Sequence, residues 1–184
     1  SRNTDRMRKD RRATAIEKFT LANTLPTDWI ANSFIVGELT KSDLAARHGI
    51  NNWFRTDAQL QSAVFTCRCV LQPIRAGLGP FVPNSVFRSQ ALERALKKKP
   101  TTWRSTSQHT LGQAADIEIP GMSNYDLADW INKYLKTWDQ LIVEFCSAND
   151  PSAGWVHISI RAYGKNRQEV LSFDGKNYLP GLRA

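Results

Sequence analysis

The stretch Ser-Gln-His-Thr-Leu-Gly-Gln-Ala-Ala-Asp, residues Ser107–Asp116, leads into Ala114–Ile119, where apolar and acidic residues alternate. Alternation of this kind is typical of a half-buried strand, with Asp116 on one face and its apolar neighbours on the other. Trp155–Ile160 (Trp-Val-His-Ile-Ser-Ile) alternates in the same way. We predict that the two strands pair, within an α+β fold in which helices flank a small central antiparallel sheet.

Pairing of these strands would bring together three side chains that are common metal ligands. Asp116 and His157 would converge on one point. His109 would reach that point from the loop before Gly112, whose missing side chain permits a tight entry into the first strand. Catalytic zinc sites take three such ligands and leave a fourth position open for water. Two plainer interpretations are a surface loop for the His-x6-Asp spacing and a core histidine, bonded to a backbone carbonyl, for His157.

The same residues resemble the signature of a known group of zinc peptidases. That group acts on bacterial cell walls and includes D-alanyl-D-alanine carboxypeptidases and dipeptidases and phage L-alanyl-D-glutamate endolysins. Its signature is Ser-x-His-x-x-Gly-x-Ala-x-Asp followed later by Trp-(x)-His, and Ser107–Asp116 has every fixed position of the first part. The likeness extends from about Phe34 to Leu182, which is most of the chain.

The resemblance implies a role for each of five residues. The ligands of Zn²⁺ would be His109, Asp116 and His157. Arg88 would bind the substrate and stabilise the developing oxyanion, and Ser107 would help to hold the substrate. For Arg88, the alternative is an ordinary solvated surface arginine.

One position departs from the pattern of this group. Many of its members carry the general-base carboxylate three residues before the last histidine, where this chain has Gly154. We expect Glu144 to replace it, because Gln140–Phe145 reads as a buried strand next to the His157 strand. A solvent-exposed Glu144 at the strand end is an equally good interpretation. Weaker candidates for the base are Asp150, Glu118 and Asp139.

Size and composition suit one domain of a small enzyme. The chain has 184 residues, 41% of them hydrophobic, which is enough for a single core. We expect a basic helical arm over residues 1–33 and a zinc peptidase-like domain over residues 34–184. No apolar run approaches the ~20 residues that span a bilayer, so no membrane span is expected. The odd count of cysteines, Cys67, Cys69 and Cys146, predicts reduced thiols.

Half of the net charge of +8 lies in the first twelve residues, which hold six basic and two acidic side chains, a net of +4. A basic arm can bind acidic wall polymers, anionic lipid or nucleic acid. Nucleic acid is the least expected partner, because the arm lacks interleaved aromatic residues. A solvated helix is the simpler interpretation.

Residue patterns also predict most helices and strands. Pro73 should begin or kink a segment within the longest expected helix, Asp57–Leu78. The residues after the last expected strand, Trp155–Ile160, should form an irregular basic tail. The expected helices are Thr4–Ala22, Lys41–His48, Asp57–Leu78, Ser89–Lys98 and Ser123–Lys136, and the expected strands are Phe81–Phe87, Ala114–Ile119, Gln140–Phe145 and Trp155–Ile160.

Together, these features predict a zinc-dependent peptidase that cleaves peptidoglycan stem peptides. The alternative is a non-catalytic phage structural or wall-binding module that retains a metal site, and Gly154 favours it. The protein would be made in the bacterial cytoplasm and act at the cell wall or periplasm, as a free lysin or a virion component. The basic arm could then bind phage structural proteins. The sequence does not define which peptide bond is cut.

Overall fold

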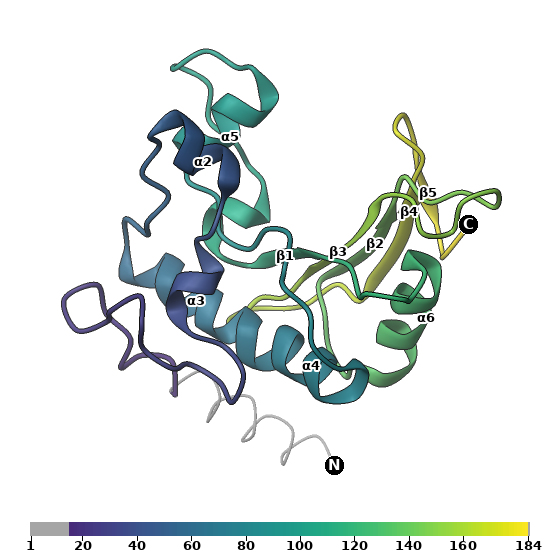
Figure 1. The fold of residues 1–184 in the computed structure, drawn as a ribbon, viewed down its shortest axis with the longest axis horizontal. Coiled ribbons are helices and arrows are strands. Elements are labelled where there is room, and N and C mark those ends of the chain that lie inside the picture. The colour runs from purple at the N-terminus through teal and green to yellow at the C-terminus, as the bar shows by residue number, and fades with distance from the viewer. Residues whose placement is uncertain (1–14, 184) are drawn as a thin grey trace.

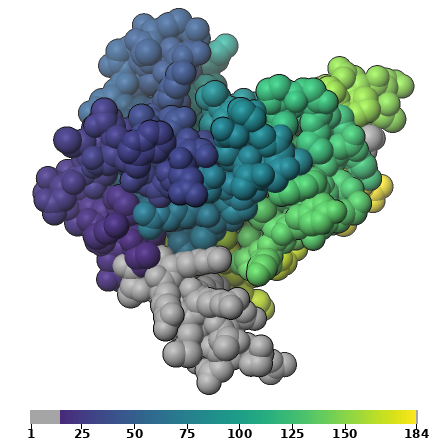
Figure 2. Space-filling model, turned by 60° about the horizontal axis from the view of Figure 1, so that its bottom comes forward, coloured from purple at the N-terminus to yellow at the C-terminus, as the bar shows by residue number. Residues whose placement is uncertain are grey.

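The computed structural model describes residues 15–183 and has an α+β fold, as predicted. The helical N-terminal part lies beside a C-terminal sheet (Figure 1), and Figure 2 shows the two parts covering different sides of the surface. The helices are η1 (Val36–Leu39), α2 (Asp43–His48), α3 (Asp57–Thr66), η2 (Cys67–Leu71), α4 (Gln72–Leu78), α5 (Gln90–Lys97), η3 (Gln108–Leu111) and α6 (Asn124–Tyr134). The strands are β1 (Ala114–Ile117), β2 (Gln140–Glu144), β3 (Trp155–Ser159), β4 (Glu169–Phe173) and β5 (Tyr178–Pro180).

The sheet has five strands in the order β1-β3-β2-β4-β5. It is mostly antiparallel, and only the β2–β4 pair is parallel. The irregular tail that we predicted is therefore wrong, because β4 and β5 form a hairpin there. Its turn is stabilised by the Asp174 carboxylate, which accepts hydrogen bonds from the backbone N–H groups of Lys176 and Asn177, both at 2.8 Å.

The two faces of the sheet have different environments. Alternate residues of the central strands, such as Ile117, Leu141 and Val156, lie in the hydrophobic core. Their neighbours along each strand, such as Asp116 and His157, point to the opposite face and line a cavity. The alternation seen in the sequence thus separates core from site, as expected for strands with one buried face.

The long helix predicted over Asp57–Leu78 forms as one run with a change of winding before Pro73. η2 is a π-helical turn, in which the Gln72 N–H bonds to the Cys67 carbonyl. Proline has no N–H to donate to the preceding turn, and a π-turn is one way in which a helix accommodates this loss. α4 then continues with Pro73 in its first turn.

Three shorter helices begin at the serines that cap them. The side chains of Ser42, Ser89 and Ser123 accept hydrogen bonds from backbone N–H groups in the first turns of α2, α5 and α6. None of the helices in residues 15–183 is long and apolar enough to cross a membrane. No disulfide joins Cys67, Cys69 and Cys146 in the described residues, which agrees with the reduced thiols that we predicted.

Two predicted elements are wrong in the described residues. Residues 15–22 of the expected Thr4–Ala22 helix form turns, because groups on α3 bind their backbone: Asp57 accepts from the Leu21 N–H at 2.8 Å, and Gln61 donates to the Phe19 carbonyl at 3.1 Å. The basic cluster of residues 1–12 lies outside the described residues. Phe81–Phe87 forms only an isolated bridge rather than a strand, since Pro83 interrupts its hydrogen bonding.

Residues 15–33, assigned to the arm in the sequence, supply buried side chains to the main core. Ile16 and Ile30 belong to the same hydrophobic cluster as the core side chains of the sheet.

Candidate metal centre

The sheet register brings two of the three predicted ligands together. Asp116 on β1 pairs directly with His157 on β3, so both side chains point to the same face. His109 reaches them from η3, which immediately precedes β1.

Gly112 allows this approach in two ways. Its φ of +73° ends η3, and a β-carbon there would lie 2.5 Å from the Gln59 carbonyl oxygen on α3. The glycine of the Ser107–Asp116 motif therefore lets η3 pack closely against α3.

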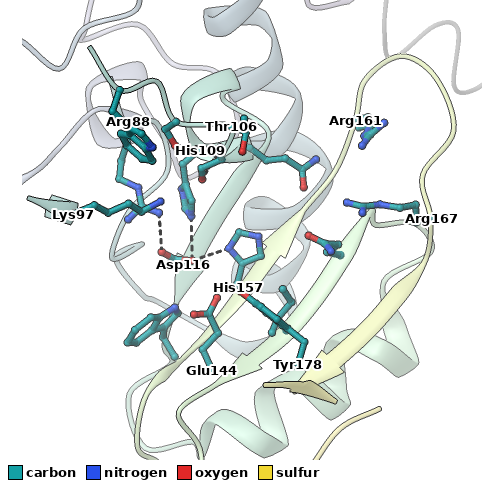
Figure 3. Close-up of a pocket in the computed structure, with 17 residues that line it drawn as sticks. Arg88, Lys97, Thr106, His109, Asp116, Glu144, His157, Arg161, Arg167 and Tyr178 are labelled. Carbon is teal, nitrogen blue, oxygen red and sulfur yellow. Dashed lines mark hydrogen bonds and ion pairs between the residues drawn. The ribbon is translucent and has the colours of Figure 1, made fainter. Parts of the chain in front are cut away.

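The three side chains form a tight cluster (Figure 3). His109 Nε2 lies 3.2 Å and His157 Nδ1 3.0 Å from the same oxygen, Oδ1 of Asp116. One potential ligand atom from each residue lies within 4.8 Å of the other two. This compact set of two imidazoles and one carboxylate can hold a metal ion.

A backbone carbonyl orients the His109 ring. Its Nδ1 lies 2.7 Å from the Val86 carbonyl oxygen, which can only accept, so Nδ1 carries the proton and donates. This assignment leaves an unprotonated Nε2 facing the cluster. A carbonyl or carboxylate behind a ligating histidine is the usual way of fixing its tautomer.

The buried environment favours a cation between His109 and Asp116. His109 is 1% exposed, and burial lowers its pKa, so the ring is neutral. Its Nε2 is buried without a hydrogen-bond partner among residues 15–183. In this tautomer, both Nε2 and the nearby Asp116 oxygen are acceptors, and two acceptors cannot bond to each other. A metal ion would satisfy both.

Asp116 is held in its ionised form. Burial alone would raise its pKa, but interactions with the neighbouring imidazoles outweigh that effect and lower the pKa. With His109 neutral, the contact that remains is the one to His157 Nδ1 at 3.0 Å, which can donate a hydrogen bond to the carboxylate. The Asp116 backbone is bonded to the segment before α5, with N–H to the Ser85 carbonyl at 2.8 Å. The ligand is thus fixed at both its carboxylate and its main chain.

The cluster lies in a cavity of about 610 Å³ on the open face of the sheet. Figure 3 shows side chains reaching it both from the segment around α5 and from the strands. The lining residues are Arg88, Lys97, Trp103, Ser105, Thr106, Ser107, Gln108, His109, Asp116, Gln140, Ile142, Glu144, Trp155, His157, Arg161, Arg167 and Tyr178.

Glu144 lies in this cavity rather than at an exposed strand end. It is on β2 opposite Trp155 of β3, and Asp116 and Glu144 are the only carboxylates among the lining residues. Burial raises the pKa of Glu144; the charge of His157 opposes this shift, and that of Asp116 adds to it. A carboxyl group with a raised pKa is better suited to take up a proton near neutral pH.

The structure explains why position 154 is glycine. Gly154 has φ +73°, and a β-carbon there would collide with the backbone carbonyl of Glu144. No carboxylate side chain can occupy this position without moving the end of β2. Position 144, and not position 154, places a carboxylate in this cavity.

The three weaker candidates for the base lie elsewhere. Glu118 accepts a hydrogen bond from Asn84 at 2.8 Å, and Asp150 is exposed in the turn after β2; neither lines the cavity. Asp139 is fully buried and bound to Arg167.

Arg88 lies in the cavity with a side chain that is only 19% exposed, so it is not an ordinary surface arginine. Its Nε is 3.2 Å from Glu93 Oε1, and one terminal nitrogen is 3.7 Å from Asp116 Oδ2. Glu93 is fully buried and also binds Lys97 at 2.8 Å. Sequence reasoning missed this buried glutamate, although the Glu93–Lys97 spacing is that of a helical ion pair.

Ser107 has a local structural contact as well as a place in the cavity. Its hydroxyl oxygen accepts a hydrogen bond from the His109 N–H at 3.3 Å, at the start of η3. The serine of the motif thus helps to set the position of the first histidine.

Neither known protein families nor curated proteins include a sequence match to this chain.

Proposed function

We propose that this protein is a zinc-dependent peptidase that cleaves peptidoglycan stem peptides. The observation that carries the proposal is the buried His109 Nε2, which faces the Asp116 carboxylate without a hydrogen bond in the described part of the chain. Two histidines and one carboxylate are a common ligand set for catalytic zinc. When bound, zinc would polarise a scissile carbonyl and lower the pKa of water.

Three protein groups would act on the substrate around this centre. Glu144 would accept a proton from the attacking water and return it to the leaving amine, a task that its raised pKa suits. Arg88 would bind the carbonyl oxygen as negative charge develops, since a guanidinium donates charge-assisted hydrogen bonds. Ser107 would contribute a hydroxyl group at the cavity wall.

The choice of substrate rests on two supports. Ser107–Asp116 and the later Trp155-x-His157 resemble the signature of the cell-wall zinc peptidases. The cavity also combines basic side chains with Trp155 and Tyr178, groups that suit a peptide with free carboxylates. By the same resemblance, the protein would act at the bacterial cell wall, as a free lysin or as part of a virion.

A single pair of measurements tests this proposal. Purified protein should contain about one zinc per chain by elemental analysis, and His157→Ala should lose it. Mass spectrometry of defined muropeptides should then show hydrolysis at one amide bond, between either D-alanine and D-alanine or L-alanine and D-glutamate. Tight zinc binding without cleavage of any stem peptide would instead favour a non-catalytic module that retains its metal site.

A further inference from the structure

A second cluster of charges lies along the same cavity, and the proposed catalytic groups do not use it. Its centre is Asp139, which directly precedes β2 and is fully buried. Oδ1 of Asp139 accepts hydrogen bonds from the Arg167 backbone N–H at 3.0 Å and from Arg167 Nε at 3.1 Å. Oδ2 accepts from a terminal nitrogen of Arg167 at 2.7 Å and from Gln108 at 3.1 Å.

Arg161 adds a second positive charge beside Asp139, whose single negative charge is already neutralised by Arg167. Arg161 Nε lies 3.4 Å from Asp139 Oδ2, but Arg167 alone already binds both oxygens of that carboxylate. Within residues 15–183, neither arginine pairs with any other carboxylate. Two guanidinium groups thus share one paired carboxylate, an excess of one positive charge among the paired groups. The nearby Glu169, whose charge also acts on Arg167, instead accepts a hydrogen bond from Gln140 at 2.6 Å. Both side chains remain accessible, at 41% and 45% exposure.

The opposite end of the cavity has no such excess. There, Arg88 and Lys97 are matched by Glu93 and Asp116, so the four charges cancel before any metal binds. Figure 3 shows Arg161 and Arg167 on the far side of His157 from Arg88. An anionic group of a ligand would therefore be attracted to the Arg161–Arg167 end.

We propose that Arg161 and Arg167 form a subsite for a substrate carboxylate located about two residues from the cleaved bond. This rests on the proposed peptidase function. Gln140, beside this cluster, lies two positions along β2 from Ile142, the register partner of His157. Two strand residues span roughly 7 Å, which is also the length of about two residues of extended peptide.

Besides the C-terminal carboxylate, stem peptides offer two carboxylates along the chain. One is the α-carboxylate of γ-linked D-glutamate, and the other is the second carboxylate of diaminopimelate. Arg167 is held by Asp139 in a fixed orientation, and Arg161 has terminal nitrogens without partners in the described residues. Such a preordered guanidinium pair recognises a planar carboxylate well.

Stem peptides with one free carboxylate are compared with matched peptides in which that carboxylate is amidated or absent. D-glutamate is compared with D-isoglutamine, and diaminopimelate with lysine, so the two sources are separated. The parent protein should show a higher kcat/KM for one free acid, and Arg161→Gln should lower that preference on the order of tenfold. Arg161→Gln leaves Asp139 bound to Arg167 and Gln108, so the fold should persist. Arg55→Gln, an exposed arginine outside the cavity, is the matched control.

Binding is measured separately from turnover, by calorimetry with the same peptides in the Glu144→Gln protein. Selective binding of the free acid that is lost with Arg161→Gln supports the subsite even if no peptide is hydrolysed. Cleavage with equal rates for acid and amide overturns the subsite and leaves the peptidase proposal intact. Equal binding of acid and amide, or no binding of either, also overturns the subsite.

Discussion

Asp116, which lines the cavity, and Asp139, which binds two of the lining residues, are both buried but have different partners. Asp139 is surrounded by Arg167, Arg161 and Gln108, so permanent positive charges neutralise it. Asp116 lies between two imidazoles, and burial keeps the His109 ring neutral.

The difference explains why Asp116, and not Asp139, is the candidate metal ligand. A buried charge is costly unless opposite charge and hydrogen bonds compensate it. Asp139 has that compensation within the protein, whereas Asp116 has one arginine, Arg88, at 3.7 Å and an acceptor nitrogen facing it. A cation at Asp116 would complete the site, but a cation at Asp139 would compete with two arginines.

The largest expected effect comes from exchanging each aspartate for asparagine. Asp116→Asn should abolish metal binding and hydrolysis, with a loss of affinity well above the roughly 10–100-fold caused by removing a supporting hydrogen bond. Asp139→Asn should keep the metal and instead lower the free energy of unfolding by about 1.5–3 kcal/mol, because hydrogen bonds to a charged group are lost. Elemental analysis and urea denaturation measure the two effects.

These two variants are controls for each other. Full metal content in Asp116→Asn, or loss of metal from a folded Asp139→Asn protein, would show that the two clusters are not distinct in the way proposed.

The next largest effect concerns the base. Glu144→Gln should keep the fold and the metal while reducing turnover on the order of 10²–10⁴-fold, the usual contribution of proton transfer. Glutamine is nearly isosteric, so packing would not account for such a loss. Adding Gly154→Glu to this variant should not restore activity, because a β-carbon at position 154 meets the Glu144 backbone carbonyl. Unchanged turnover in Glu144→Gln would remove Glu144 from the mechanism.

Arg88 should have a somewhat smaller effect. Arg88→Ala should lower kcat on the order of 10²–10³-fold, as for removal of an oxyanion donor, with metal content unchanged. Arg88→Lys should rescue poorly, since a lysine cannot reproduce the planar fork. Glu93→Gln should act through Arg88, with which Glu93 pairs at 3.2 Å, and leave a partial defect that is smaller than that of Arg88→Ala. Cleavage at the parent rate by Arg88→Ala would make it a structural ion-pair partner only.

The sequence predicted the candidate metal cluster because strand alternation is a local property of the chain. Once Ala114–Ile117 and Trp155–Ser159 pair, the two-residue period allows Asp116 and His157 to share one face, as they do in the structure. The candidate base was harder to predict from the sequence, because Glu144 lies on a third strand whose neighbour depends on the loop between residues 145 and 154. Its placement beside β3 agrees with the prediction.

The errors arose where distant contacts decide the local structure. The Thr4–Ala22 helix was wrong over residues 15–22 because Asp57 and Gln61 on α3 bind the backbone there, which helix propensity does not reveal. The β4–β5 hairpin could have been predicted, since Asp174-Gly175 between β-prone residues is a turn signal. The Asp139–Arg161–Arg167 cluster gave no local pattern, because its residues are far apart in the chain.

The smallest expected effect is the acid dependence of stability from Asp139. Burial raises the pKa of this carboxyl, but its hydrogen bonds and ion pairs with Arg167 and Arg161 lower it to about 2. A depressed pKa contributes stability that is complete above the unfolded value, about 3.9, and is lost as the pH falls through about 2. Because this group binds a single proton, it can change the free energy of unfolding by at most about 1.4 kcal/mol per pH unit. Urea denaturation of metal-free protein between pH 5 and pH 2 should therefore show the free energy of unfolding falling more steeply in the parent than in Asp139→Asn. Parallel curves of unfolding free energy against pH would contradict the lowered pKa of Asp139.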